Sequence, residues 1–181
     1  MSHPLRLLII SGTAVSYYLL YQLNILLFGS LNFSHRVDWV FLPSGLRLAF
    51  VLLFLADGAI GIALASTLIT YLMYFDGSYV SMVLSGSLAG LAPYIARLVA
   101  IHWFNLEENL VNIKHIGLFK ISVLFAIISA VIHQLWYFWI GKTSDFIDSA
   151  LVMMVGDWLG TVLVLAALQI CIVVTRKLQQ R

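Results

Sequence analysis

The chain has 181 residues, of which 62% are hydrophobic and only 10% are charged, and its mean hydropathy is +1.00. A soluble domain carries about a quarter charged residues, so this composition excludes a water-soluble fold and predicts an integral membrane protein. The net charge of +2 is too small to indicate a nucleic-acid partner, and the single cysteine, Cys171, excludes an internal disulfide.

Long apolar stretches recur along the chain, and a spanning helix needs about 20 such residues. The stretch 42–75 would be about 50 Å long as one helix, which is too long for a single crossing, and its central ADGAIG predicts a turn. We therefore predict an all-α membrane bundle that forms one domain over residues 1–181. Its six transmembrane helices are expected near 5–29, 44–56, 58–75, 79–103, 116–140 and 149–174.

The basic residues predict the orientation of this bundle. Six spans put both termini on one side of the membrane, and only Arg36 and Lys142 flank the opposite side. The side of the termini is flanked by Arg6, Arg97, Lys114, Lys120, Arg176, Lys177 and Arg181. The positive-inside rule then places both termini in the cytoplasm, which predicts a multi-pass protein of a bacterial inner membrane.

Three ionisable residues on three predicted helices fall in the outer half of the bilayer. Asp157 is about 12 Å from the outer end of its helix, His133 about 10 Å, and Arg47 about 5 Å with a side chain that reaches deeper. Charges at this depth are costly and need partners. The residues close to them in sequence are Gln134, Trp136, Tyr137 and Trp158.

Two interpretations of this group stay open. In the structural one, Arg47 and Asp157 form an ion pair that joins two helices, with His133 hydrogen-bonded nearby. In the functional one, they line an outward-facing pocket whose aromatic walls hold a small ligand. The two interpretations can hold together.

A second candidate ion pair, Asp57 with Arg97, is expected near the inner surface in a structural role. The histidines do not indicate heme, because His102 and His133 differ in depth by about 20 Å or more. No motif for hydrolysis or metal binding is evident, so we expect no catalytic residue, metal or cofactor.

Small residues spaced four apart predict close helix packing, as in membrane helix dimers. Gly86 and Gly90 form one such pair, and Gly156 and Gly160 form another. The simpler interpretation is packing within one bundle. The alternative is docking of a partner membrane protein on an exposed small-residue face.

Two segments carry a family resemblance. FLPSGLRLAFVLLFLADGAIGIALAS (41–66) and GDWLGTVLVLAAL (156–168) resemble elements of membrane-associated sensor domains of the MASE type. The six-span layout is also similar to the substrate-binding S components of energy-coupling-factor vitamin transporters. S components generally carry an AxxxA docking patch on the first helix, whereas this chain has only Gly12 and Ser16 at that spacing.

These observations leave three hypotheses. The resemblance implies a non-catalytic sensory or regulatory module that binds a small ligand or a partner on its outer side and acts through a signalling partner. The alternative is the substrate-binding subunit of an uptake transporter, which would also need partner proteins. A third hypothesis is a structural scaffold without a ligand. In each case the lipid bilayer is a partner.

Overall fold

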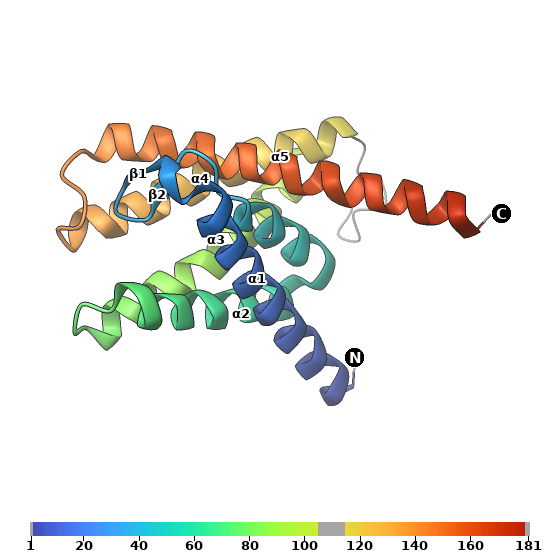
Figure 1. Cartoon of the computed structure of the whole chain (residues 1–181), viewed down its shortest axis with the longest axis horizontal. Coiled ribbons are helices and arrows are strands. Elements are labelled where there is room, and N and C mark those ends of the chain that lie inside the picture. The colour runs from blue at the N-terminus through green and yellow to red at the C-terminus, as the bar shows by residue number, and fades with distance from the viewer. Residues whose placement is uncertain (1, 105–114, 180–181) are drawn as a thin grey trace.

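The structure is a computed structural model that describes residues 2–104 and 115–179 (Figure 1). Its elements in chain order are α1 (His3–Phe28), the short 3₁₀ turn η1 (Gly29–Leu31), β1 (Asn32–Ser34), β2 (Val37–Asp38), α2 (Pro43–Tyr74), α3 (Tyr79–Phe104), α4 (His115–Trp139) and α5 (Phe146–Gln179). Within these residues, five helices are long and apolar enough to cross a membrane. This architecture fits a multi-pass membrane protein.

Helix α2 is broken at Leu55, whose φ of 54° and ψ of −128° are not helical. A Cβ atom on Gly58 would clash with the carbonyl oxygen of Phe50, so the chain folds back closely on itself here. The break falls two residues before Asp57 and inside the long stretch that the sequence predicts to turn. The first segment, 43–54, is only about 18 Å long and cannot cross a bilayer alone. The described residues therefore give five helices of spanning length, where we predicted six.

The molecule has two distinct ends, which lie right and left in Figure 1. The terminal end holds the start of α1, the break in α2, the end of α3 and the projecting end of α5. The hairpin end holds the β1–β2 hairpin and the turns 75–78 and 140–145. The hairpin is antiparallel, and Ser34 pairs with Val37 across its two-residue turn.

The glycines of GDWLG have a different role from the predicted one. A Cβ atom on Gly156 would clash with the carbonyl oxygen of Asp38, and one on Gly160 with that of Phe41. The Phe41 amide also donates a hydrogen bond of 3.1 Å to the Gly156 carbonyl. These glycines therefore admit the extended connector 38–42 against α5, and the start of α2 also packs at Gly160, since a Cβ atom on Gly45 would lie 3.0 Å from its carbonyl oxygen. This connector enters the bundle far enough for α2 to begin beside the middle of α5.

The other glycine pair lies between two helices. A Cβ atom on Gly86 would clash with the Thr67 side chain, and one on Gly90 with the carbonyl oxygen of Ala59. Small residues on α3 thus allow the second segment of α2 to approach closely, as the packing interpretation expects. Both glycines are buried within the chain, so neither offers a free docking face.

Candidate functional site

A cavity lies at the hairpin end of the bundle, and all five long helices contribute to its wall. Its lining residues are Tyr17, Tyr21, Arg36, Asp38, Phe41, Arg47, Ser66, Ile69, Ala89, His133, Tyr137 and Met153. The cavity has a volume of about 30 Å³ accessible to water, and about 430 Å³ of empty space when the part open to solvent is included. The cavity is therefore narrow, and its wall combines tyrosine rings with charged groups.

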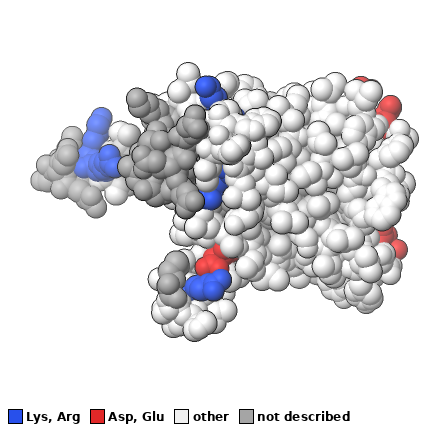
Figure 2. Space-filling view, turned by 180° about the vertical axis from the view of Figure 1, so that it is seen from behind, with Lys and Arg blue, Asp and Glu red and all other residues white. Residues whose placement is uncertain are grey.

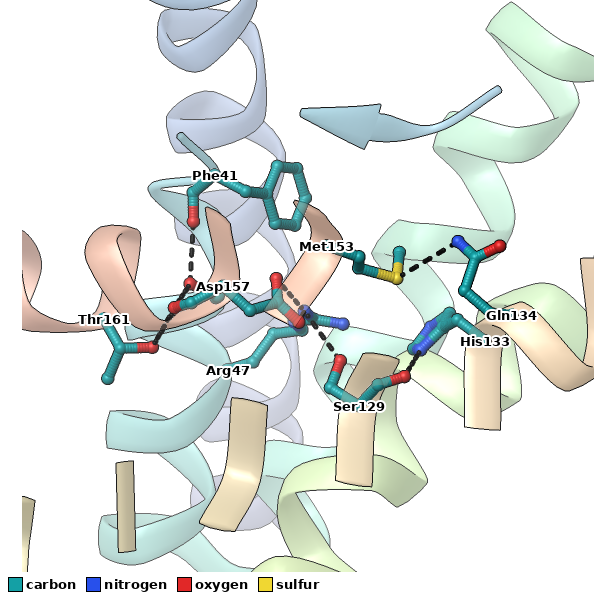
Figure 3. Close-up of polar contacts among 9 residues, drawn as sticks. Phe41, Arg47, Ser129, His133, Gln134, Met153, Asp157 and Thr161 are labelled. Atoms are coloured by element: carbon teal, nitrogen blue, oxygen red, sulfur yellow. Dashed lines mark hydrogen bonds and ion pairs between the residues drawn. The ribbon is translucent and has the colours of Figure 1, made fainter. Parts of the chain in front are cut away.

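Arg47 and Asp157 form a buried ion pair beside this cavity (Figure 3). The Arg47 Nη2 atom lies 2.9 Å from both carboxylate oxygens of Asp157, and it donates to the Ser129 hydroxyl at 3.2 Å. Their side chains are only 3% and 1% exposed. The pair joins the first segment of α2 to α5, and Ser129 adds α4. Arg47, Asp157 and Ser129 therefore form a polar cluster that joins three helices.

The Arg47 guanidinium is held between two aromatic rings. Its Cζ atom lies 5.4 Å from the centroid of Phe41 and 5.3 Å from that of Phe125. Its Nε atom is buried and has no hydrogen-bond partner among the described residues. Asp157 thus neutralises the charge of Arg47, and the two rings lie against its guanidinium.

The main chain of α5 is also tied to α2 at Asp157. The Ser44 hydroxyl lies 2.6 Å from the Asp157 carbonyl oxygen, and the Thr161 hydroxyl donates to the same oxygen at 2.7 Å. Ser44 is the second residue of α2, so the start of this short segment is pinned at two points, by Ser44 and by Arg47. These contacts favour a structural role for the Arg47–Asp157 pair.

His133 lies one helical turn beyond Ser129 and lines the cavity. Its Nδ1 atom is 2.8 Å from the Ser129 carbonyl oxygen. A carbonyl can only accept, so Nδ1 donates in this hydrogen bond. His133 does not take part in the Arg47–Asp157 pair itself. Tyr137, one turn further along α4, places its ring 6.1 Å from the imidazole.

Gln134 was predicted to be near a ligand, but its amide is bound elsewhere. It donates to the Met153 sulfur at 3.6 Å (Figure 3). It also accepts a hydrogen bond of 3.2 Å from the Thr143 hydroxyl. It is fully buried and does not line the cavity. Gln134 therefore joins α4 to α5 and to the turn that precedes α5.

The two predicted tryptophans also lie outside the cavity. Trp136 donates from its indole nitrogen to the Ser85 hydroxyl at 2.9 Å, which joins α4 to α3. Trp158 packs edge-on against Phe119, with 6.0 Å between ring centroids. Both were candidates only because they are close in sequence to Asp157 and His133, and helical periodicity turns them onto other faces.

Asp57, which the sequence predicts to pair with Arg97, binds Arg6 in the structure. The Arg6 guanidinium donates to both carboxylate oxygens of Asp57 at 2.8 to 3.1 Å. This contact joins the start of α1 to the residue that follows the break in α2. Arg97 is buried on α3. The sequence places all three residues at one depth, but only the packing of α1 decides which arginine reaches Asp57.

Sequence reasoning missed the connector residues that cover the cavity. Arg36 lies in the hairpin turn, with its Cζ atom 4.8 Å from the ring centroid of Tyr74 and 5.8 Å from that of Tyr137. Asp38 follows in β2, and its carboxylate accepts from the Asn32 amide at 2.9 Å. The sequence treats Arg36 only as a flanking charge. The signal that could have identified it is the density of charged and aromatic residues in HRVDWVF.

His35 gives the hairpin turn a pH dependence. Its ring packs edge-on against Tyr74 and Tyr137, with centroids 5.7 and 5.6 Å away. Burial, followed by the charges of Arg36 and Lys142, lowers the pKa of His35, while Asp76 acts in the opposite direction. The folded hairpin thus binds fewer protons than the open one, and its stability falls as the pH drops below about 6.5.

After correction for the intrinsic effect of pH on exchange, we expect the amide hydrogens of residues 31–42 to exchange faster at about pH 5 than at about pH 7. The variant His35→Gln should lose this dependence, because it cannot gain a proton. Burial raises the pKa of Asp38, so protonation of that carboxyl at low pH opposes the effect of His35. An unchanged pH dependence in His35→Gln would show that another group controls the hairpin.

Among the described residues, no three His, Cys, Asp or Glu side chains are grouped in a way that could hold a metal ion. What the structure does bring together is the Arg47–Asp157 ion pair, the His133 imidazole and a tyrosine-walled cavity under the hairpin. A scan against family models, a search of curated proteins and a search of solved structures find no match to this chain.

Proposed function

We propose that this chain is a non-catalytic membrane module that binds a small ligand in the cavity under the hairpin and acts through a partner protein. The observation that carries the proposal is the cavity itself: all five long helices and the hairpin meet around it. Ligand sites in helical bundles commonly lie between helices, with a few polar groups in an aromatic wall. The resemblance to MASE-type sensors is part of this proposal.

The charge distribution supports an orientation with the hairpin end outside a bacterial inner membrane. In Figure 2 the blue side chains lie toward the terminal end, and the opposite end carries red ones. Among the described residues that flank the membrane, Arg6, Lys120, Arg176 and Lys177 belong to the terminal end, and Arg36 and Lys142 to the hairpin end. For a bundle with six membrane-embedded segments, the positive-inside rule then favours a cytoplasmic terminal end.

The last helix supports action through a partner. The 34 residues of α5 extend for about 51 Å, and the end of the helix projects beyond the rest of the bundle (Figure 1). Leu168, Ile170 and Val173 are exposed along this part. Asp157 and Gly160 fix the first half of the same helix next to the cavity. A conformational change at the cavity can therefore be transmitted along this continuous helix to the cytoplasmic side.

The test is to fill the cavity and measure ligand retention. Ser66 is buried on α2 and lines the cavity, so Ser66→Leu is expected to displace whatever small molecule remains bound after purification. The matched control is Leu68→Phe, on the same helix segment but exposed and outside the cavity. Native mass spectrometry of the three proteins in nanodiscs measures the bound mass directly.

Wild type and Leu68→Phe should carry the same bound mass, and Ser66→Leu should lose it. Retention of that mass by Ser66→Leu would place the ligand elsewhere. A wild-type protein with no bound mass, even after incubation with a small-molecule extract of cells, would favour the structural scaffold. A mass that co-purifies with an ATPase pair would favour the transport subunit.

A further inference from the structure

The charges around the cavity are unevenly paired. Asp157 neutralises Arg47 at 2.9 Å, and the Asp38 carboxylate accepts a hydrogen bond from Asn32. Arg36, by contrast, has no hydrogen bond or ion pair with any residue in 2–104 or 115–179, and its contacts are the two tyrosine rings. Of the charged side chains that line the cavity, it alone lacks a polar partner within the described part of the chain.

Arg36 is half-buried, and its guanidinium lies over tyrosine rings at the wall of the cavity. Tyr137, over which it lies, is buried at 2% exposure, and the guanidinium shares the cavity wall with Tyr17 and His133. An arginine at a membrane surface usually extends to water or to lipid headgroups. Here the side chain turns inward over aromatic rings, where a planar guanidinium stacks well and keeps its donors free.

The backbone at Arg36 is a second observation. Its φ is 58°, in the left-handed region that glycine and asparagine adopt most readily. An arginine here makes the two-residue turn less stable than asparagine would. The geometry of the turn therefore does not explain why residue 36 is arginine. The explanation is to be sought in what its side chain binds.

We infer that the cavity takes a ligand with an anionic oxygen group, a carboxylate or a phosphate, held by the free guanidinium of Arg36 between tyrosine rings. This inference rests on the proposed ligand-binding function and specifies the chemical class. The guanidinium donates paired hydrogen bonds to two oxygens of the anion. The Tyr17 and Tyr137 hydroxyls line the same space and have no hydrogen-bond partner within the described residues, so they are available to the ligand.

The test compares two probes of the same shape, benzoate and the neutral benzamide, by calorimetry on the full chain in phosphatidylcholine nanodiscs. Benzoate is expected to bind more tightly than benzamide. The variant Arg36→Asn removes the guanidinium and suits the positive φ, so it should fold at least as stably as wild type. We expect it to bind benzoate roughly tenfold to a hundredfold more weakly, the loss typical of a charged hydrogen bond.

Two further variants test whether benzoate binding depends on the Arg36 guanidinium or on any positive charge at the hairpin end. Lys142→Gln removes the other cation at the hairpin end, which lies outside the cavity and pairs with Asp76, so it should bind benzoate like wild type. Arg36→Lys keeps the charge without the planar fork and should fall between wild type and Arg36→Asn.

Equal binding of benzoate and benzamide, or unchanged benzoate binding in Arg36→Asn, would overturn the inference. If, in that case, wild type binds both probes and Ser66→Leu binds neither, the cavity binds small molecules and the proposed function stands. If neither probe binds, and no mass is retained by the purified protein, the anion site and the ligand-binding function both fail.

The lipid composition of the nanodiscs distinguishes an anionic group on a soluble molecule from one on a lipid. Nanodiscs that contain phosphatidylglycerol should leave benzoate binding unchanged if the ligand is a soluble molecule. If phosphatidylglycerol competes with benzoate in wild type but not in Arg36→Asn, the natural occupant is a lipid headgroup phosphate. Inorganic phosphate serves as the matching soluble competitor.

Discussion

Asp157→Asn is expected to destabilise the protein by about 3–5 kcal/mol, because it leaves the Arg47 guanidinium charged in a site that is closed to water. The reverse change, Arg47→Gln, should cost a similar amount by leaving the carboxylate alone. Both side chains are almost fully buried, and the pair joins α2 to α5 at 2.9 Å. The measurement is the free energy of unfolding in detergent micelles, with tryptophan fluorescence as the probe.

The double variant Arg47→Gln/Asp157→Asn should be clearly more stable than the sum of the two single losses predicts, with a coupling of about 1–3 kcal/mol. Ser129→Ala is the matched control within the cluster, since it removes only one hydrogen bond to Arg47 and should cost about 1 kcal/mol. Additive single effects would mean that the two residues act independently. Full rescue of folding would mark the pair as structural and leave ligand binding to Arg36.

Gly160→Ala is expected to destabilise the protein by about 3 kcal/mol, the upper part of the range for overpacking. The added methyl group would clash with the backbone carbonyl oxygen of Phe41, and a backbone cannot move aside as a flexible side chain can. Because the connector 38–42 also carries the hairpin, hydrogen exchange in the hairpin should rise in the same variant.

The chain contains a matched control for this substitution. Gly12 lies in α1, is exposed, and has nothing within 4 Å of an added Cβ atom. Gly12→Ala should therefore be neutral or slightly stabilising, because alanine is the better helix former by about 1 kcal/mol. If both variants were equally mild, the close approach of the connector to α5 would not be required for stability.

Part of the site could be predicted from sequence because depth in a membrane follows residue number along a helix. Arg47 and Asp157 come from distant parts of the chain, yet both are predicted in the outer half of the bilayer, where the long Arg47 side chain can reach the deeper Asp157, and each needs a partner in lipid. Asp57 shows the limit of this argument. Two arginines were at a suitable depth, and depth alone could not choose between Arg6 and Arg97.

Rotation about a helix axis was harder to predict than depth. Trp136 and Trp158 are close to the site in sequence, but their side chains leave on other faces and pack on Ser85 and Phe119. These helices are apolar on almost every side, so hydrophobic periodicity does not reveal which face is inside.

The sequence by itself determined the membrane class, the helical architecture and the need to pair its buried charges, because an apolar chain in lipid must satisfy its backbone within helices. Only the tertiary structure decided that Gly156 and Gly160 admit an extended connector, and that Arg36 lies over the cavity. Both depend on how an irregular segment packs back into the bundle. Such a path is set by side-chain contacts far apart in sequence, and no local pattern specifies it.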